Sequence, residues 1–194
     1  MSKLIVLAET DPGTTVLSTS DGDEIAAELA GRGVRFERWE ATAALDDHAG
    51  QDEVLAAYAA DVDRLRAEGY GTVDVVRLHP DPDDADWPTK AAEARNKFLA
   101  EHTHDDDEVR FFVEGSGAFY LRIGGEICIA LCEAGDLISV PADTRHWFDM
   151  GTNPSFAAIR FFQIEDGWVG NFTGDDIATR FPTYDELVVG AAPA

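Results

Sequence analysis

Five short apolar runs separated by glycine-containing turns most constrain what this chain can fold into. The runs cover residues 108–113, 118–123, 126–131, 137–140 and 156–162. The turns between the first four contain the segments GSG at 115–117, GG at 124–125 and EAGD at 133–136. Many short strands joined by tight turns are typical of an antiparallel barrel or jelly roll. We therefore predict a mainly β fold (α+β overall) with peripheral helices.

The first hundred residues mix strands with helices, which we expect to be additions to that barrel. Strand-like runs occupy residues 4–7, 35–39 and 73–78. Helices are predicted over residues 21–33, 52–68 and 89–100. The helix at 52–68 has the clearest pattern, because apolar residues from Val54 to Leu65 recur at helical spacing and Gly69 follows. Residues 175–181 and 184–189 are predicted to be short helical or irregular cover, and residues 190–194 to fray.

A chain of 194 residues is long enough to bury a sizeable core. We find no internal repeat or low-complexity linker, and expect a single domain over residues 1–194. In that domain, residues 1–100 form the N-terminal additions, residues 101–165 the barrel core and residues 166–194 a C-terminal cover.

Charge excludes some partners. The chain has 15 Lys and Arg against 38 Asp and Glu, a net charge of −23. Such a surface repels phosphate backbones and anionic lipids, so neither nucleic acid nor a membrane is expected as a partner. The sequence has no apolar run of the ~18 residues that a membrane span requires and no signal-type N-terminus. We therefore expect a cytoplasmic protein.

The two cysteines, Cys128 and Cys132, lie in one predicted strand. Four residues of strand span about 13 Å, whereas bridged Cα atoms lie within about 7 Å. We expect two reduced, inward-facing thiols.

A histidine-rich segment, HTHDDDE at residues 102–108, contains the candidate chemistry. His102, His104, Glu108 and Arg110 share parity, so an uninterrupted strand would direct all four to one face. His146, which follows a proline turn, would join them from a second strand. Imidazole with carboxylate is typical of non-haem iron, nickel or manganese, whereas structural zinc usually has thiolates. Four such ligands leave two octahedral positions for a bidentate oxygen ligand such as an enediolate.

Other interpretations stay open at this stage. A His-x-His pair occurs by chance on surfaces, and Asp105 and Asp106 are expected to be solvated. Arg110 is suited to a substrate anion, because its charge is permanent, but also to a structural salt bridge. We expect His48 and His79 to be surface residues.

The spacing of these residues resembles the two cupin motifs. The first is His-x-His-x3-Glu-x6-Gly over residues 102–115, and the second is Gly-x5-Pro-x4-His over residues 135–146. Asn96 and Asp143 stand where the usual pattern has glycine.

Longer blocks resemble the acireductone dioxygenase family of the cupin superfamily. They are KFLAEHTH (97–104), DEVRFFV (107–113), GDLISVP (135–141), TRHWFDM (144–150), AIRFF (158–162), GWV (167–169) and the upstream helix with Leu55, Tyr58 and Asp61. The likeness covers nearly the whole chain and implies a cupin jelly-roll barrel and a monomer.

The resemblance also implies roles for individual residues. His102, His104, Glu108 and His146 would bind one Fe(II) or Ni(II) per monomer. Arg110 would favour the substrate dianion, and Glu101 and Asp107 would affect metal loading and transmit conformational change. Metal-binding histidines usually have their second nitrogen held by a carboxylate or carbonyl, for which Glu101, Asp107 or Asp149 are available.

The implied reaction belongs to methionine salvage. The acireductone 1,2-dihydroxy-3-keto-5-methylthiopentene would be cleaved by O₂. Iron would give formate and 4-methylthio-2-oxobutanoate, and nickel would give formate, carbon monoxide and methylthiopropionate. Phe98, Phe148 and Trp168 are candidates for the wall around the methylthio end, although core packing explains each of them equally well.

Two alternatives remain. One is a cupin dioxygenase acting on another substrate, such as a flavonol or diketone, which the segments 107–110 and 145–149 disfavour. The other is a cupin that binds a small molecule without catalysis. The presence of all four metal ligands disfavours it, because a pure binding module would not need them together.

Overall fold

One long strand, β6 (Glu108–Ile123), belongs to both faces of the barrel in the computed structural model, which describes residues 1–46 and 48–189. Its first half pairs with β8 (Asp136–Val140) and β10 (Phe156–Phe162), and its second half pairs with β7 (Glu126–Glu133) and β9 (His146–Asp149). The predicted strands 108–113 and 118–123 are therefore one strand. The glycines between them bend it and do not end it.

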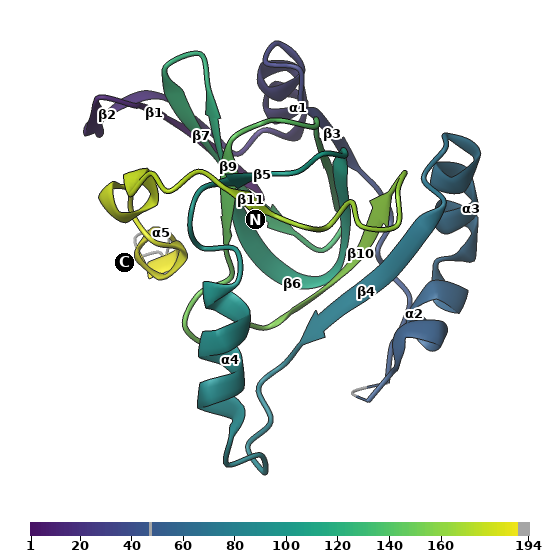
Figure 1. Cartoon of the computed structure of the whole chain (residues 1–194). Helices are drawn as coiled ribbons and strands as arrows, with labels where there is room; N and C mark the ends of the chain where they lie inside the picture. The colour runs from purple at the N-terminus through teal and green to yellow at the C-terminus, as the bar shows by residue number, and fades with distance from the viewer. Residues whose placement is uncertain (47, 190–194) are drawn as a thin grey trace.

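The strands form two antiparallel sheets that share β6, and together they curve into the barrel of Figure 1. The first has the order β11 (Asn171–Phe172), β5 (His102–Thr103), β9, β6, β7, β1 (Lys3–Ala8), β2 (Asp11–Thr19). The second has the order β4 (Thr72–Leu78), β10, β6, β8, β3 (Arg35–Arg38). This arrangement confirms the predicted mainly β, cupin-like fold. The prediction missed β2, because this exposed edge strand lacks an apolar face.

Gly115 allows β6 to pass from one sheet to the other. Its φ is +61°, and a Cβ built there would lie 1.8 Å from the carbonyl oxygen of Ser155. Since L-residues rarely adopt this backbone region and the space is closed, only glycine fits.

Gly115→Ala should therefore lower the free energy of unfolding by about 3–5 kcal/mol, because backbone strain and a backbone clash add together. Gly124→Ala is the matched control, since Gly124 has a φ of +63° but a Cβ added there would meet nothing within 4 Å. It should cost only about 1–2 kcal/mol. Urea denaturation measures both values, and equal losses would show that the close approach to Ser155 does not matter.

Helices cover the outside of the barrel (Figure 1). They are α1 (Gly22–Ala30), α2 (Gln51–Ala57), α3 (Ala59–Ala67), α4 (Trp87–Asn96), the 3₁₀ turn η1 (Ile177–Arg180) and α5 (Tyr184–Val189). The predicted helix at 52–68 is wrong in one respect, because Tyr58 interrupts it with a φ of −113° and a ψ of 29°. The Tyr58 ring packs edge-on to Phe111, at 5.4 Å between centroids, so both short helices still face the sheet. Residues 190–194, predicted to fray, lie outside the described residues.

Three apolar clusters hold these layers together. The first fills the barrel and includes Phe112, Phe119 and Phe148. The second lies between the barrel and α2 and α3, and the third lies below η1 and α5. Cys128 and Cys132 are free and buried, as predicted. Burial raises the pKa of the Cys128 thiol to about 11. No helix of the described chain is long and apolar enough to cross a membrane.

Candidate metal centre

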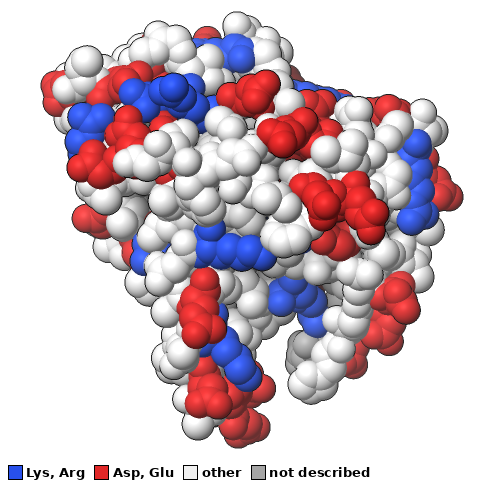
Figure 2. All heavy atoms as spheres, in the orientation of Figure 1, with Lys and Arg blue, Asp and Glu red and all other residues white. Residues whose placement is uncertain are grey.

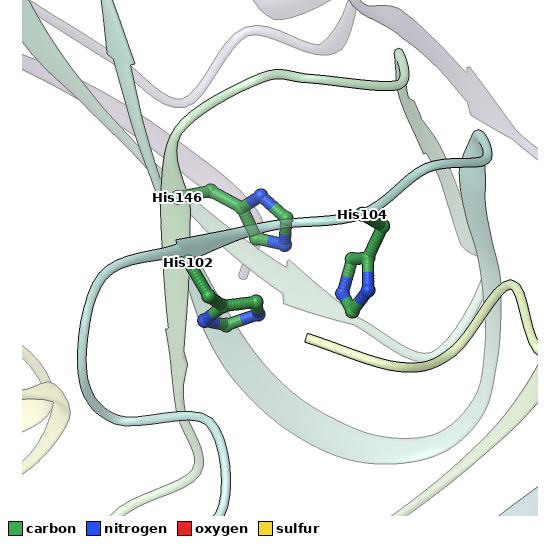
Figure 3. A group of neighbouring side chains, drawn as sticks. All are labelled: His102, His104 and His146. Atoms are coloured by element: carbon green, nitrogen blue, oxygen red, sulfur yellow. The ribbon is translucent and has the colours of Figure 1, made fainter. Parts of the chain in front are cut away.

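Three histidines converge inside one end of the barrel. His102 on β5 and His146 on β9 are direct partners in the antiparallel ladder, and His104 follows two residues after His102. Ring centroids lie 4.4 Å apart for His102 and His146, 5.0 Å for His102 and His104, and 5.2 Å for His104 and His146. One ring nitrogen of each lies within 4.8 Å of the others, and all three side chains are buried. Figure 3 shows the rings turned toward one common space.

Backbone carbonyls orient all three rings. Nδ1 of His102, His104 and His146 lies 2.8 Å from the carbonyl oxygens of Ala100, Val169 and Thr144, respectively. An Nδ1–H donated to a carbonyl leaves Nε2 unprotonated and free to bind a metal. Of the two kinds of partner expected, a carboxylate or a carbonyl, carbonyls hold all three rings, so the candidates Glu101, Asp107 and Asp149 are wrong for this role.

Glu108 lies beside the three histidines at the start of β6. Its Oε2 is 3.0 Å from Nε2 of His146 and 3.5 Å from Nε2 of His104. Its Oε1 accepts from Nε of Arg110 at 2.8 Å and from Nη2 at 2.6 Å. One carboxylate oxygen thus faces the histidines while the other is paired with a guanidinium.

The electrostatics favour charge states suited to metal binding at Glu108 and His102. Burial alone would raise the pKa of Glu108, but Arg110, His104 and His146 together hold it well below its ordinary value. Burial, with help from His146, lowers the pKa of His102 to about 4. The ionised carboxylate of Glu108 and the neutral imidazole of His102 are the forms that bind metal. Burial would lower the pKa of His104 as well, but its hydrogen bond to Glu108 and the charge of that carboxylate raise it above the ordinary value.

Arg110 is buried between aromatic rings. Its guanidinium carbon lies 4.3 Å from the ring centroid of Phe148 and 4.9 Å from that of Phe119. The structural salt bridge that the sequence left open does form, and its partner is Glu108. Arg110 also lines a cavity, so the pairing does not exclude contact with a bound anion.

A cavity of about 210 Å³ adjoins the site. It is mostly apolar, and Phe98 and Phe148, two of the three predicted aromatic residues, line it. Trp168 is not among its lining residues, but its ring lies 4.6 Å from Nζ of Lys97, which is one of them. The remaining lining residues are Val76, Leu78, Ala94, Arg110, Met150, Phe156 and Arg160.

Glu101 and Asp107 flank the histidine segment and tie it to other parts of the chain. Glu101 is buried, accepts from the Thr173 hydroxyl at 2.7 Å and pairs with Arg122 at 3.1 Å. Asp107 accepts from the Ala142 amide at 2.9 Å. This last bond connects the segment to the turn that precedes His146.

Asp106 is buried, contrary to expectation. Its Oδ2 accepts the backbone N–H groups of Gln163 at 2.6 Å and Ile164 at 2.9 Å. It therefore holds the loop that reaches Val169, whose carbonyl orients His104. Asp105 is exposed as expected and bonds Asn171.

The two other histidines lie outside the site. His48 is exposed. His79 is partly buried, with Nε2 2.9 Å from Glu114 and Nδ1 3.2 Å from Ser155. A surface position is thus correct for His48 and only partly correct for His79.

Phe119 is a site residue that the sequence reasoning missed. Residues 108, 110 and 112 of β6 face the site or the barrel interior, whereas after the bend the inward residues are 119 and 121. The parity changes because the β6–β10 register shifts between Glu114 and Phe112 and because β6 bends at Gly115. The glycines at 115 and 117 were the available signal.

Fold and site together define the class. A barrel of antiparallel strands that encloses convergent imidazoles beside a carboxylate is a metal-binding β-barrel of the cupin type.

Comparison with known proteins gives the family within that class. Residues 10–170 match the ARD/ARD' family. The acireductone dioxygenase of Parvibaculum lavamentivorans is 61% identical over 186 residues, which cover 95% of this chain and 98% of that protein. Acireductone dioxygenase 1 of Nocardia farcinica is 56% identical over 189 residues, covering 97% and 100%.

A solved structure agrees with these sequence relatives. It is the acireductone dioxygenase from Bacillus anthracis with a cadmium ion in its active centre, with a TM-score of 0.73 at 28% identity over 89% of this chain and 98% of that one. The chain belongs to the ARD/ARD' family. This confirms the family that the sequence motifs indicate.

Proposed function

We propose that the protein is a metal-dependent dioxygenase that cleaves the acireductone 1,2-dihydroxy-3-keto-5-methylthiopentene with O₂ in methionine salvage. The observation that carries this proposal is the convergence of three buried imidazoles beside Glu108 and Arg110, with Arg110 also lining an apolar cavity. The relatives named acireductone dioxygenase support it at 51–61% identity.

His102, His104, His146 and Glu108 are the proposed ligands of one Fe(II) or Ni(II) per monomer. The donor set fits such an ion, because Nδ1 of each histidine is engaged by a carbonyl and one Glu108 oxygen is directed at the imidazoles. When bound, the metal supplies a Lewis acid that orients enediolate and O₂. The same ligands serve either ion, so the iron products and the nickel products described above are both part of the proposal.

Arg110 is proposed to stabilise the negative charge of the bound enediolate. Burial lowers the pKa of Arg110, but the ordinary value is so high that the guanidinium stays charged near neutral pH. Its charge then acts over a short distance in a medium of low polarity. The rings of Phe119 and Phe148 hold it at the cavity wall next to Glu108.

The apolar cavity is proposed to receive the methylthio chain. Phe98 and Phe148 supply its aromatic wall, and the apolar lining excludes water from the reacting atoms. Trp168 is proposed to lie at the cavity mouth, where its ring contacts the ammonium of Lys97.

Glu101 and Asp107 are proposed to maintain the histidine segment in a conformation that accepts metal. Asp107 can do this because it bonds the turn before His146, so the two halves of the ligand set move together. Glu101 does so through Arg122 and Thr173.

The test is direct. The protein is purified without oxygen, its bound metal is quantified, and portions are loaded with Fe(II) or Ni(II). We expect O₂-dependent loss of acireductone absorbance with both metals, and different products by chromatography. If neither the Fe(II)-loaded nor the Ni(II)-loaded protein causes that loss, the proposal is rejected. The protein would then be a cupin that acts on another substrate or a cupin without catalytic activity.

A further inference from the structure

Lys97 follows α4 and lies at the mouth of the cavity. Its Nζ is 4.6 Å from the ring centroid of Trp168 and 5.3 Å from that of Phe98, and its side chain lines the cavity while remaining exposed. Lys97 therefore presents a positive charge both to solvent and to the cavity.

The cations of this cavity differ in how they are paired. Arg110 pairs with Glu108 at 2.6 Å, and Arg160 pairs with Asp74 at 2.6 Å. Lys97 makes no ion pair with any residue that the structure describes, although acidic residues greatly outnumber basic ones. Within the described chain, its ammonium contacts the two aromatic faces instead. Its charge thus remains available to an incoming anion.

The overall charge makes an available cation useful. A net charge of −23 disfavours the approach of an anion to the surface as a whole. Acidic side chains are spread over the face in Figure 2. A local positive charge at the cavity mouth offsets this repulsion at a place where an anion can enter the cavity.

We propose that Lys97 is a positioning residue that draws the anionic acireductone to the cavity mouth and delivers it toward Arg110. This rests on the proposed function, since it assumes an anionic substrate. The contact of Nζ with two rings keeps the ammonium at the mouth. No carboxylate of the described residues neutralises its charge there, so the charge can attract the anion.

A structural role for Lys97 is the competing explanation. Its contact with Trp168 could simply fix the loop at 163–170 by a cation–π interaction. Lys97→Met removes the charge and keeps most of the chain length, Lys97→Arg keeps charge and stacking, and Lys97→Glu reverses the charge. Lys90→Met is the matched control, because Lys90 lies on α4, pairs with Asp84 at 2.6 Å and does not line the cavity.

Steady-state kinetics of the metal-loaded protein gives the first measurement. At low ionic strength, Lys97→Met should lower kcat/KM about three- to tenfold with kcat unchanged, and Lys97→Glu should lower it further. Above ~0.3 M salt, kcat/KM of the wild type should exceed that of Lys97→Met by less than about twofold, because the screening length shrinks below 8 Å. Lys97→Arg should retain the wild-type value, and Lys90→Met should change neither quantity. A salt-independent loss in kcat would overturn the proposal in favour of loop fixation.

A second measurement does not depend on turnover. Quenching of Trp168 fluorescence by iodide and by neutral acrylamide is measured as the difference between each protein and its Trp168→Phe counterpart. Lys97→Met should lower the ratio of the iodide quenching constant to the acrylamide quenching constant about two- to threefold at low salt. Lys90→Met should leave this ratio unchanged. An unchanged ratio in Lys97→Met would overturn the proposal. If the wild type shows no turnover, the proposed function fails, and the iodide result still decides whether Lys97 attracts anions.

Discussion

His146→Ala should abolish stoichiometric metal binding and lower kcat/KM by more than about 10³-fold, because a ligand contributes more than the 10–100-fold typical of the groups that orient ligands. His146 is central to the site. Its ring lies 4.4 Å from that of His102 and 5.2 Å from that of His104, and its Nε2 lies 3.0 Å from Glu108. Its removal takes away one donor and also one of the groups that orient the Glu108 carboxylate.

Metal content after anaerobic loading and dialysis measures the first effect, and O₂-dependent loss of acireductone absorbance measures the second. His79→Ala is the control, because His79 is a partly buried histidine that also contacts a glutamate, Glu114, at 2.9 Å. It should retain both properties. One metal per chain in His146→Ala, held as tightly as in the wild type, would remove His146 from the proposed ligand set.

Arg110→Met should lower kcat/KM by about 10²–10³-fold, the usual effect of losing one preorganised charge-stabilising donor. Metal loading should persist, since the cation in the site then compensates the Glu108 charge that Arg110 no longer neutralises. Arg110→Lys should recover only part of the activity, because an ammonium lacks the planar fork that now holds Glu108 and the stacking on Phe148.

Arg160→Met is the control for Arg110. Arg160 lines the same cavity, but its guanidinium is engaged by Asp74 through two hydrogen bonds, at 2.8 and 2.6 Å. Its loss should affect kcat/KM much less. Loss of metal in Arg110→Met, with the control still loaded, would show that Arg110 serves only to hold Glu108 in place.

The strands of the second half were predictable because their signals are local. The run at 156–162 coincides with β10, and the runs at 126–131 and 137–140 lie within β7 and β8. Alternation of apolar residues and glycine turns depends on a few adjacent residues, so no long-range information is required. The bend in β6 was not predictable in this way, because it depends on the approach of Ser155 to Gly115 from a distant segment.

The candidate site shows the same division. Parity placed Glu108 and Arg110 on one face, and the structure brings them together at 2.6 Å. Carbonyls were expected among the groups that orient the histidines, but which carbonyls could not be named, because every residue has one. Asp106 was misjudged since its partners, the amides of Gln163 and Ile164, lie more than fifty residues away.

The sequence by itself determined the family, the strand pattern of the barrel and the residue types of the candidate site, because spacing and chemical type are properties of the chain. Only the tertiary structure decided that His102 meets His146 across β5 and β9, that carbonyls orient all three rings, and that Lys97 is the cation at the cavity mouth without a carboxylate partner among the described residues. These features depend on contacts between segments far apart in the chain, which strand pairing creates and which no local pattern specifies.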